Sequence, residues 1–222
     1  LQLSIGDSFT TNFGTGTGGP PASKAFFQVG PNTLFGPASG GVFIAANTPV
    51  GFGGLVADMI RRGMVDAVVC TGANAYHDLH FAFGLPVTHG TDKVDDNRLR
   101  EDETTRIYTQ YIHNEKTLKM QDALVQLYAK SMLKRKPLKV KPPFSTAKFI
   151  NELGKEILRD DFGYVKDREG SFFLTAARYD VPVFLDSGSN HSLAMDLAAL
   201  SLEGLTVDTS PSRDIIEAAA LS

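Results

Sequence analysis

Two short apolar segments separated by an amphipathic one constrain the fold of this chain more than any other feature. Residues 42–46 and residues 65–70 are almost entirely apolar, as expected of strands covered on both faces. Residues 53–62 have the apolar spacing of a helix, and Gly63 follows as a helix stop. Strand, helix and strand in close succession form a βαβ unit, so the sequence predicts a parallel β-sheet.

The same alternation is expected in the rest of the chain. Further helices are expected at residues 74–83, 145–158, 171–179, 189–203 and 212–221, and a further strand at residues 181–185. The intervening stretch predicts charged helical segments at residues 97–111 and 118–134. Because the last helix ought to precede another strand, we expect the sheet to be incomplete in this chain.

The N-terminal part differs in composition from the rest. Residues 15–21 read Thr-Gly-Thr-Gly-Gly-Pro-Pro, which excludes a helix interior or a central strand. The sequence therefore predicts a Gly/Pro-rich N-terminal segment, residues 1–41, followed by one α/β domain, residues 42–222.

Charge and cysteine content narrow the class of protein. The net charge of −3, from 22 basic and 25 acidic residues, argues against nucleic acid or an anionic membrane surface as the main partner. The single cysteine, Cys70, excludes a disulfide framework within the chain and fits a reducing compartment. No apolar run approaches the roughly 20 residues that span a bilayer, and no secretory signal is visible, so we expect a cytoplasmic location and no membrane segment.

Small and polar residues follow three of the expected strands, at residues 47–49, 71–74 and 186–190. In parallel sheets, ligands bind beyond the carboxyl ends of the strands, where the following helices present free amides. None of these turns matches the dinucleotide pattern GxGxxG, and turns that precede helices use the same residue types for capping. From these residues alone, a structural role is the simpler interpretation.

Histidine and acidic side chains near these turns are less specific signals. His77, beside Asp78, is a candidate base or a ligand for a cationic nitrogen, or else a buried histidine satisfied by hydrogen bonds. His80 lies on a similar face, but the spacing places no third ligand, so we predict no metal site. Asp196, within an apolar helix, either faces solvent or awaits a cation.

The order of several motifs along the chain is much more specific. Residues 65–84, VDAVVCTGANAYHDLHFAFG, resemble the strand, TGAN turn and HDL helix of the deoxyhypusine synthase family. Further matches follow in order at residues 89–90, 99–101, 105–108, 114–115, 153–155, 181–184 and 189–193. The resemblance extends from about residue 42 to residue 222, and the TGAN and HD forms are more similar to the bacterial and archaeal branch than to the animal one.

The resemblance implies a Rossmann-like parallel sheet with helices on both faces, which binds NAD and assembles as a tetramer. It implies oxidation of spermidine by NAD, an imine intermediate and transfer of the aminobutyl group to a lysine of a translation factor precursor, eIF5A or its archaeal counterpart. The positions that it assigns to NAD binding are Thr48, Thr71, Gly72, Ala73 and Asn190. The positions that it assigns to the polyamine are Tyr76, His77, Ser192 and Asp196.

One feature of the family is missing. The family's imine forms on a lysine that follows a glycine-rich turn, and none of the lysines in this chain follows such a turn. Pro49 and Phe52 also stand where the family often has small or polar residues. We therefore expect a subunit or fragment of such an enzyme that is inactive as this chain alone, with no catalytic residue here. We also expect a homo- or hetero-tetramer in which another chain supplies the lysine. The alternatives are a homospermidine synthase-like aminobutyltransferase, and a non-catalytic scaffold subunit that complements a catalytic paralogue.

Overall fold

The computed structural model describes residues 48–135, 145–185, 191–205 and 210–220, together with the backbone of residues 2–4, 10–12 and 41–44. Its helices are η1 (Thr48–Val50), α1 (Gly53–Arg61), α2 (Gly72–Ala82), α3 (Asp96–Glu101), η2 (Asn114–Lys119), α4 (Met120–Arg135), α5 (Thr146–Arg159), α6 (Phe172–Arg178), α7 (Ser192–Leu202) and α8 (Pro211–Ala220). Its strands are β1 (Gln2–Ser4), β2 (Thr10–Asn12), β3 (Gly41–Ile44), β4 (Ala67–Cys70), β5 (Val87–His89), β6 (Thr104–Ile107), β7 (Gln110–His113) and β8 (Val183–Leu185).

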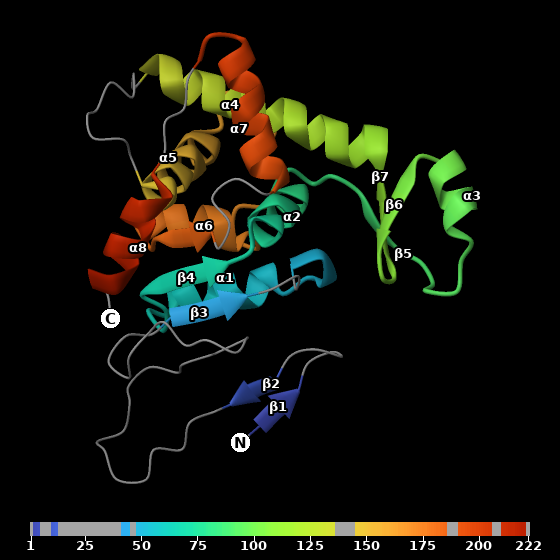
Figure 1. Ribbon diagram of the computed structural model, residues 1–222, viewed down its shortest axis with the longest axis horizontal. Coiled ribbons are helices and arrows are strands. Elements are labelled where there is room, and N and C mark those ends of the chain that lie inside the picture. The colour runs from blue at the N-terminus through green and yellow to red at the C-terminus, as the bar shows by residue number, and fades with distance from the viewer. Residues whose placement is uncertain are drawn as a thin grey trace.

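A parallel sheet in the order β3-β4-β8 lies at the centre of this α/β fold, and α1 connects β3 to β4 (Figure 1). The central strand β4 is buried throughout: Val68 and Cys70 face one apolar cluster, and Ala67 and Val69 face another. Burial on both faces explains why this strand lacks an apolar-polar alternation in the sequence. The predicted βαβ unit and parallel sheet are confirmed.

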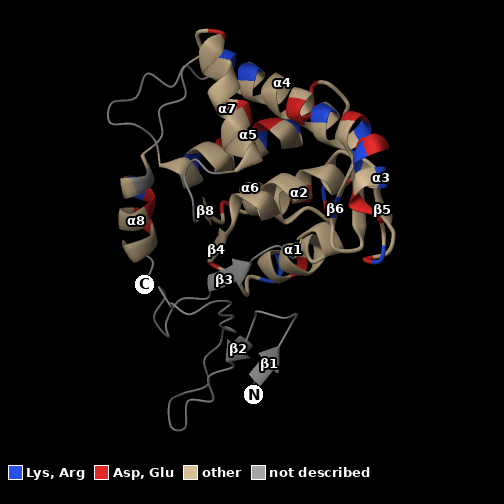
Figure 2. Cartoon of the chain, turned by 45° about the vertical axis from the view of Figure 1, so that its right-hand side comes forward, with Lys and Arg blue, Asp and Glu red and all other residues tan. Residues whose placement is uncertain are grey.

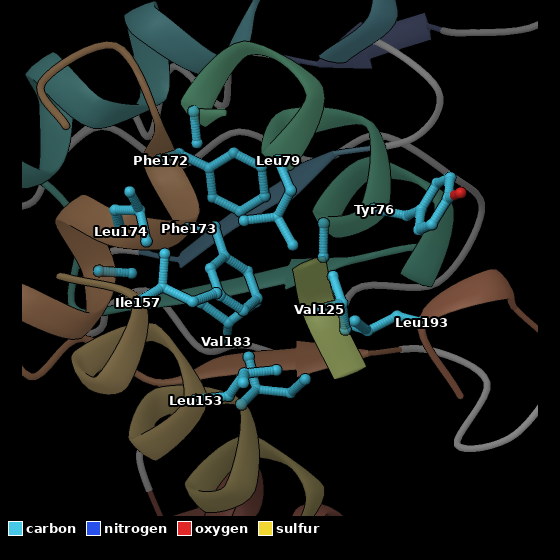
Figure 3. Packing of buried hydrophobic residues seen from close by; sticks show 14 of the residues in the cluster. Tyr76, Leu79, Val125, Leu153, Ile157, Phe172, Phe173, Leu174, Val183 and Leu193 are labelled. Carbon is cyan, nitrogen blue, oxygen red and sulfur yellow. The ribbon is translucent and has the colours of Figure 1, made fainter. Parts of the chain in front are cut away.

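Six helices share the larger apolar cluster with one face of the sheet. Residues from α1, α2, α4, α5, α6 and α7 pack together there, whereas the smaller cluster on the opposite face involves α5 and α8. Figure 3 shows Leu79, Val125 and Leu193, from α2, α4 and α7, pointing into the larger cluster. Because α2, α4 and α7 share this core, polar side chains at its edge can contact one another across the three helices.

A second, antiparallel sheet in the order β5-β7-β6 lies with α3 to one side of the main sheet (Figure 1). The helix predicted for residues 97–111 is therefore wrong beyond α3, although α4 confirms the helix predicted for residues 118–134. Glu103 and Tyr108 have positive φ angles of 49° and 54°, which end α3 and turn the chain between β6 and β7.

Asp78, a buried residue of α2, joins α2 to the first turn of α6. Its carboxylate accepts hydrogen bonds from the Ser171 hydroxyl, at 2.5 Å, and from the amides of Phe172 and Phe173, at 3.3 and 3.0 Å. A Cβ atom added to Gly53 would lie 2.3 Å from Asp78 Oδ1, so the first turn of α1 packs directly on the same carboxylate. Asp78 thereby fixes the position of α2, which carries several of the predicted site residues.

Charged side chains lie along α4 and around α3, β5 and β6, away from the shared core (Figure 2). None of the helices within the described ranges combines the length and the hydropathy that a bilayer crossing requires. The predicted division of the chain into an N-terminal segment, residues 1–41, and an α/β domain, residues 42–222, stays a prediction.

Candidate functional site

Asn74 connects the two turns that follow β3 and β4. Its Oδ1 accepts hydrogen bonds from the amide and the hydroxyl of Thr48, at 3.1 and 2.8 Å, and its Nδ2 donates to Thr71 Oγ1 at 2.9 Å. Thr48, a predicted NAD contact, is buried, and both of its donors are used in this clamp. Thr71, another predicted contact, is partly exposed. Asn74 thus fixes the position of the turn after β3 relative to the turn after β4.

The N-termini of α2 and α7 meet beyond the carboxyl ends of β4 and β8. A Cβ atom added to Gly72 would lie 2.1 Å from Cγ of His191, so the imidazole of His191 packs on the backbone of Gly72. His191 also caps α7, because its Nδ1 accepts a hydrogen bond from the amide of Ala194 at 3.1 Å. Neither helix has an acidic residue in its first turn, and α2 has no side-chain cap. Two positive helix ends therefore lie side by side.

This arrangement fits the pyrophosphate group of NAD. The first amides of a helix have no partner within the helix and favour an anion. Ala73 is exposed and presents no bulky side chain at this end of α2, whereas Gly72 is buried beneath the ring of His191. Thr71, Gly72 and Ala73 are the described residues that would hold the cofactor. Asn190, the remaining predicted contact, lies outside the described residues.

An acidic cluster lies where α2, α4 and α7 come together. Tyr76 donates a hydrogen bond from its hydroxyl to Oδ1 of Asp122 at 2.6 Å, and Figure 3 shows this hydroxyl pointing away from the apolar side chains. Asp196 accepts a hydrogen bond at Oδ1 from Gln126 Nε2, at 3.3 Å, whereas its buried Oδ2 has no hydrogen-bond partner among the described residues. Asp196 is only 5% exposed, so the cluster places an unsatisfied acceptor in the interior.

The electrostatics of this cluster disfavour negative charge in the absence of a ligand. Burial, followed by repulsion from Asp122, raises the pKa of Asp196 to about 7, whereas the Gln126 hydrogen bond lowers it. Burial, and then the hydrogen bond to Asp122, raise the pKa of the Tyr76 hydroxyl well above its ordinary value. A bound cation would relieve both effects, since it supplies the missing donor and the missing positive charge.

Two histidines of α2 form a chain of hydrogen bonds with α4. His77 Nδ1 lies 3.0 Å from His80 Nε2, and His80 Nδ1 lies 2.6 Å from Oε1 of Gln121. Burial lowers the pKa of both histidines to about 4, so both are neutral near pH 7. Within the described ranges, no group of three or more His, Cys, Asp or Glu side chains is arranged to hold a metal ion.

The structure therefore brings most of the predicted positions to one region. Gly72, Ala73, Tyr76 and His77 lie on the first turns of α2, while Ser192 and Asp196 lie on the first turns of α7, which packs against α2. The partners that sequence reasoning did not assign are Asn74, Gln121, Asp122, Gln126 and His191. Of these, Asn74 had a local signal, because it lies in the TGAN turn.

The model of the deoxyhypusine synthase family matches residues 41–221 of the chain. A deoxyhypusine synthase-like protein from Nostoc sp. is 35% identical over 178 residues, which is 80% of this chain and 44% of the relative. Probable deoxyhypusine synthase 1 from Methanosarcina acetivorans is 33% identical over 139 residues, which is 63% of this chain and 38% of the relative. The chain thus spans less than half the length of these curated relatives.

A solved structure shares the fold. The chain superposes on a putative deoxyhypusine synthase from Entamoeba histolytica with a TM-score of 0.56 and 12% sequence identity, over 80% of this chain and 50% of the other. At this identity the likeness concerns the fold alone. It agrees with the parallel sheet and its surrounding helices.

Proposed function

The chain belongs to the deoxyhypusine synthase family, a family of transferases, and from this membership we propose that it is part of an NAD-dependent aminobutyltransferase that uses spermidine. The acceptor in this proposal is a lysine of an eIF5A-like precursor, and the catalytic lysine comes from another chain of a tetramer. The acidic cluster of Tyr76, Asp122 and Asp196 is the observation that carries the proposal. A polyamine is a ligand whose charge and donors match that cluster.

The chemistry of a polyamine complements the cluster in two ways. An ammonium group donates hydrogen bonds, and Oδ2 of Asp196 is a buried acceptor without a partner in the described part of the chain. An ammonium group is also positive, and Asp196 and Asp122 repel each other when both are ionised. A charge-assisted hydrogen bond would satisfy both requirements at once.

The proposed roles of this chain are binding and orientation. NAD, when bound, supplies the acceptor for a hydride from the carbon next to the spermidine nitrogen. The first turn of α2 would hold the cofactor's pyrophosphate through the amides that follow Thr71. One turn later, the same helix carries Tyr76 and His77, which would contact the polyamine, so cofactor and substrate would be aligned by one rigid element.

Exposed apolar side chains on α7 and α8 support the proposal that another chain binds this one. Met195 and Leu202 of α7 are 63% and 91% exposed, and Ile215 and Ile216 of α8 are 72% and 67% exposed. On each of these two helices, the pair of exposed apolar side chains is a candidate contact for another protein chain. Intact-mass analysis of material purified from the source cells should therefore show a second polypeptide with a lysine after a glycine-rich turn. A single 24.0 kDa species that cleaves spermidine would contradict the need for that lysine.

Asp196→Asn should weaken spermidine binding about tenfold or more, because it removes the negative charge that an ammonium group would pair with. Titration calorimetry with the purified chain measures this change. Since the ionised carboxylate binds the cation, wild-type affinity should rise as the pH increases through about 7, with release of a proton on binding. Asp196→Asn should lose this pH dependence and the proton release.

Glu203→Gln is the matched control, because Glu203 follows α7 and pairs with Lys130 at the surface. It removes one negative charge from the same region outside the cluster, and it should leave spermidine affinity within about twofold. Equal losses in both variants would point to general electrostatic attraction and would reject the cluster as the binding site. Transfer of labelled aminobutyl groups to a protein lysine, compared with free putrescine, separates the proposal from the homospermidine synthase-like alternative.

A further inference from the structure

The hydrogen-bond chain from α4 to His77 has only one consistent direction. It begins at the backbone carbonyl oxygen of Tyr76, which lies 2.7 Å from Nε2 of Gln121. A carbonyl oxygen can only accept, so the amide group of Gln121 donates there. If the Gln121 amide were rotated by half a turn, its Oε1 would face the carbonyl oxygen of Tyr76, and both atoms can only accept. This repulsion fixes the orientation of the amide.

The orientation of Gln121 determines the tautomer of His80. The Gln121 Oε1 atom, which can only accept, lies 2.6 Å from Nδ1 of His80, so Nδ1 carries the proton. His80 is completely buried and neutral, and its Nε2 is therefore left with a lone pair. That lone pair faces Nδ1 of His77 at 3.0 Å.

The lone pair on Nε2 of His80 determines which nitrogen of His77 carries the proton. Because Nε2 of His80 accepts, Nδ1 of His77 must donate and carries the proton. In a neutral imidazole the other nitrogen, Nε2, is then an acceptor without a proton. No hydrogen bond to Nε2 of His77 occurs among the described residues, and the His77 side chain is partly exposed.

We propose that Gln121 and His80 are positioning residues that lock His77 in the Nδ1-protonated tautomer, so that its Nε2 accepts a hydrogen bond from an amine of the bound substrate. The ligand class, an alkylamine, rests on the proposed function. The lock itself rests on the geometry of the unliganded chain. Asp196 and Asp122 would pair with positive charge, whereas His77 would add an uncharged acceptor that fixes the direction of an N–H bond.

The position of His77 supports this role. Its ring lies edge-on to that of Tyr76, with a centroid distance of 5.5 Å, and Tyr76 donates to Asp122 in the acidic cluster. A doubly protonated or Nε2-protonated histidine at this place would present a donor, and an ammonium group, which can only donate, would find no acceptor there. Preorganisation through buried partners provides the acceptor before the ligand binds.

Long-range ¹H–¹⁵N NMR spectra of the ¹⁵N-labelled, ligand-free chain test the lock directly, because they distinguish protonated from unprotonated imidazole nitrogens. We expect Nδ1–H and an unprotonated Nε2 for both His77 and His80 near pH 7. A proton on Nε2 of His77 in the wild-type spectrum would overturn the proposal without any variant being required.

Gln121→Leu should release both histidines into mixed tautomers and weaken spermidine binding about fivefold, as expected for one misoriented hydrogen bond. Gln126→Leu is the matched control, since Gln126 lies on the same helix but contacts Asp196. It should leave both histidine tautomers unchanged even though spermidine binding changes. If His77 in Gln121→Leu stays protonated at Nδ1 and spermidine affinity is unaltered, Gln121 does not orient His77.

The two proposals fail in different ways. If the wild-type chain binds no spermidine, the proposed function and the amine contact of His77 both fall, whatever the imidazole spectra show. If the chain binds spermidine but His77 is protonated at Nε2, the proposed function stands and the lock is wrong.

Discussion

Replacing Asp78 by alanine is expected to lower the free energy of unfolding by on the order of 3 kcal/mol or more, the largest stability effect of any single polar side chain discussed above. The substitution removes the acceptor for the Ser171 hydroxyl and for two amides of α6, all of them buried. It also leaves a void beside Gly53, where α1 packs on the carboxylate. Chemical denaturation of the purified chain, followed by circular dichroism, measures the change.

Asp78→Asn should cost less than Asp78→Ala, because one acceptor oxygen remains. Asp58→Ala is the control, since Asp58 is partly exposed and pairs with Arg62, the residue that follows α1, and it should change the free energy of unfolding by less than about 0.5 kcal/mol. A loss of stability in Asp78→Ala no larger than that in Asp58→Ala would show that the junction does not hold α1, α2 and α6 together.

The pH dependence of this junction follows from the raised pKa of Asp78. Burial raises the pKa to about 7, against 3.8 for the unperturbed group, although the hydrogen bonds from Ser171 and α6 oppose the shift. Between these two values the folded state binds more protons at Asp78 than the unfolded state, so its contribution to stability is full at low pH and is lost as the pH rises towards 7. Asp78→Asn removes this contribution, and its deficit relative to wild type should therefore shrink over the same interval.

Local sequence patterns were sufficient to predict most of the main sheet and its helices. The helix predicted at residues 53–62 is α1, Gly53–Arg61, and the strand predicted at residues 65–70 contains β4, Ala67–Cys70. Both elements are signalled by their own apolar spacing. The segment with β6 and β7 could not be recognised in this way, because strands of four residues with mixed exposure carry almost no periodicity.

The parts of the site that lie within one turn or helix were likewise predictable, and those that join distant segments were not. His77 and His80 are three residues apart on one helix, so their proximity follows from the helical repeat. The contact of Tyr76 with Asp122 spans 46 positions and depends on how α2 packs against α4. A charged pattern in α4 is equally typical of a solvated face, and only the fold distinguishes Asp122 from its exposed neighbours.

Gly72→Ala is expected to reduce NAD affinity by about tenfold or more, because the added methyl group occupies the position of the His191 ring. The ring cannot withdraw without losing the cap on α7, since its Nδ1 accepts a hydrogen bond from the Ala194 amide. The substitution should therefore separate the N-termini of α2 and α7, which together form the proposed pyrophosphate site. Titration calorimetry with NAD, alongside thermal unfolding, distinguishes lost affinity from lost stability.

A second substitution provides the control. His191→Ser removes the ring but keeps a residue type suited to capping α7, so it makes room for the methyl group of Gly72→Ala. In the double variant, the loss of stability should be smaller than the sum of the two single losses by at least about 1 kcal/mol. Strictly additive losses would show that Gly72 and His191 are not in direct contact. Undiminished NAD affinity in a folded Gly72→Ala variant would place the cofactor elsewhere, because a pyrophosphate held by the first amides of α2 could not tolerate the displaced ring.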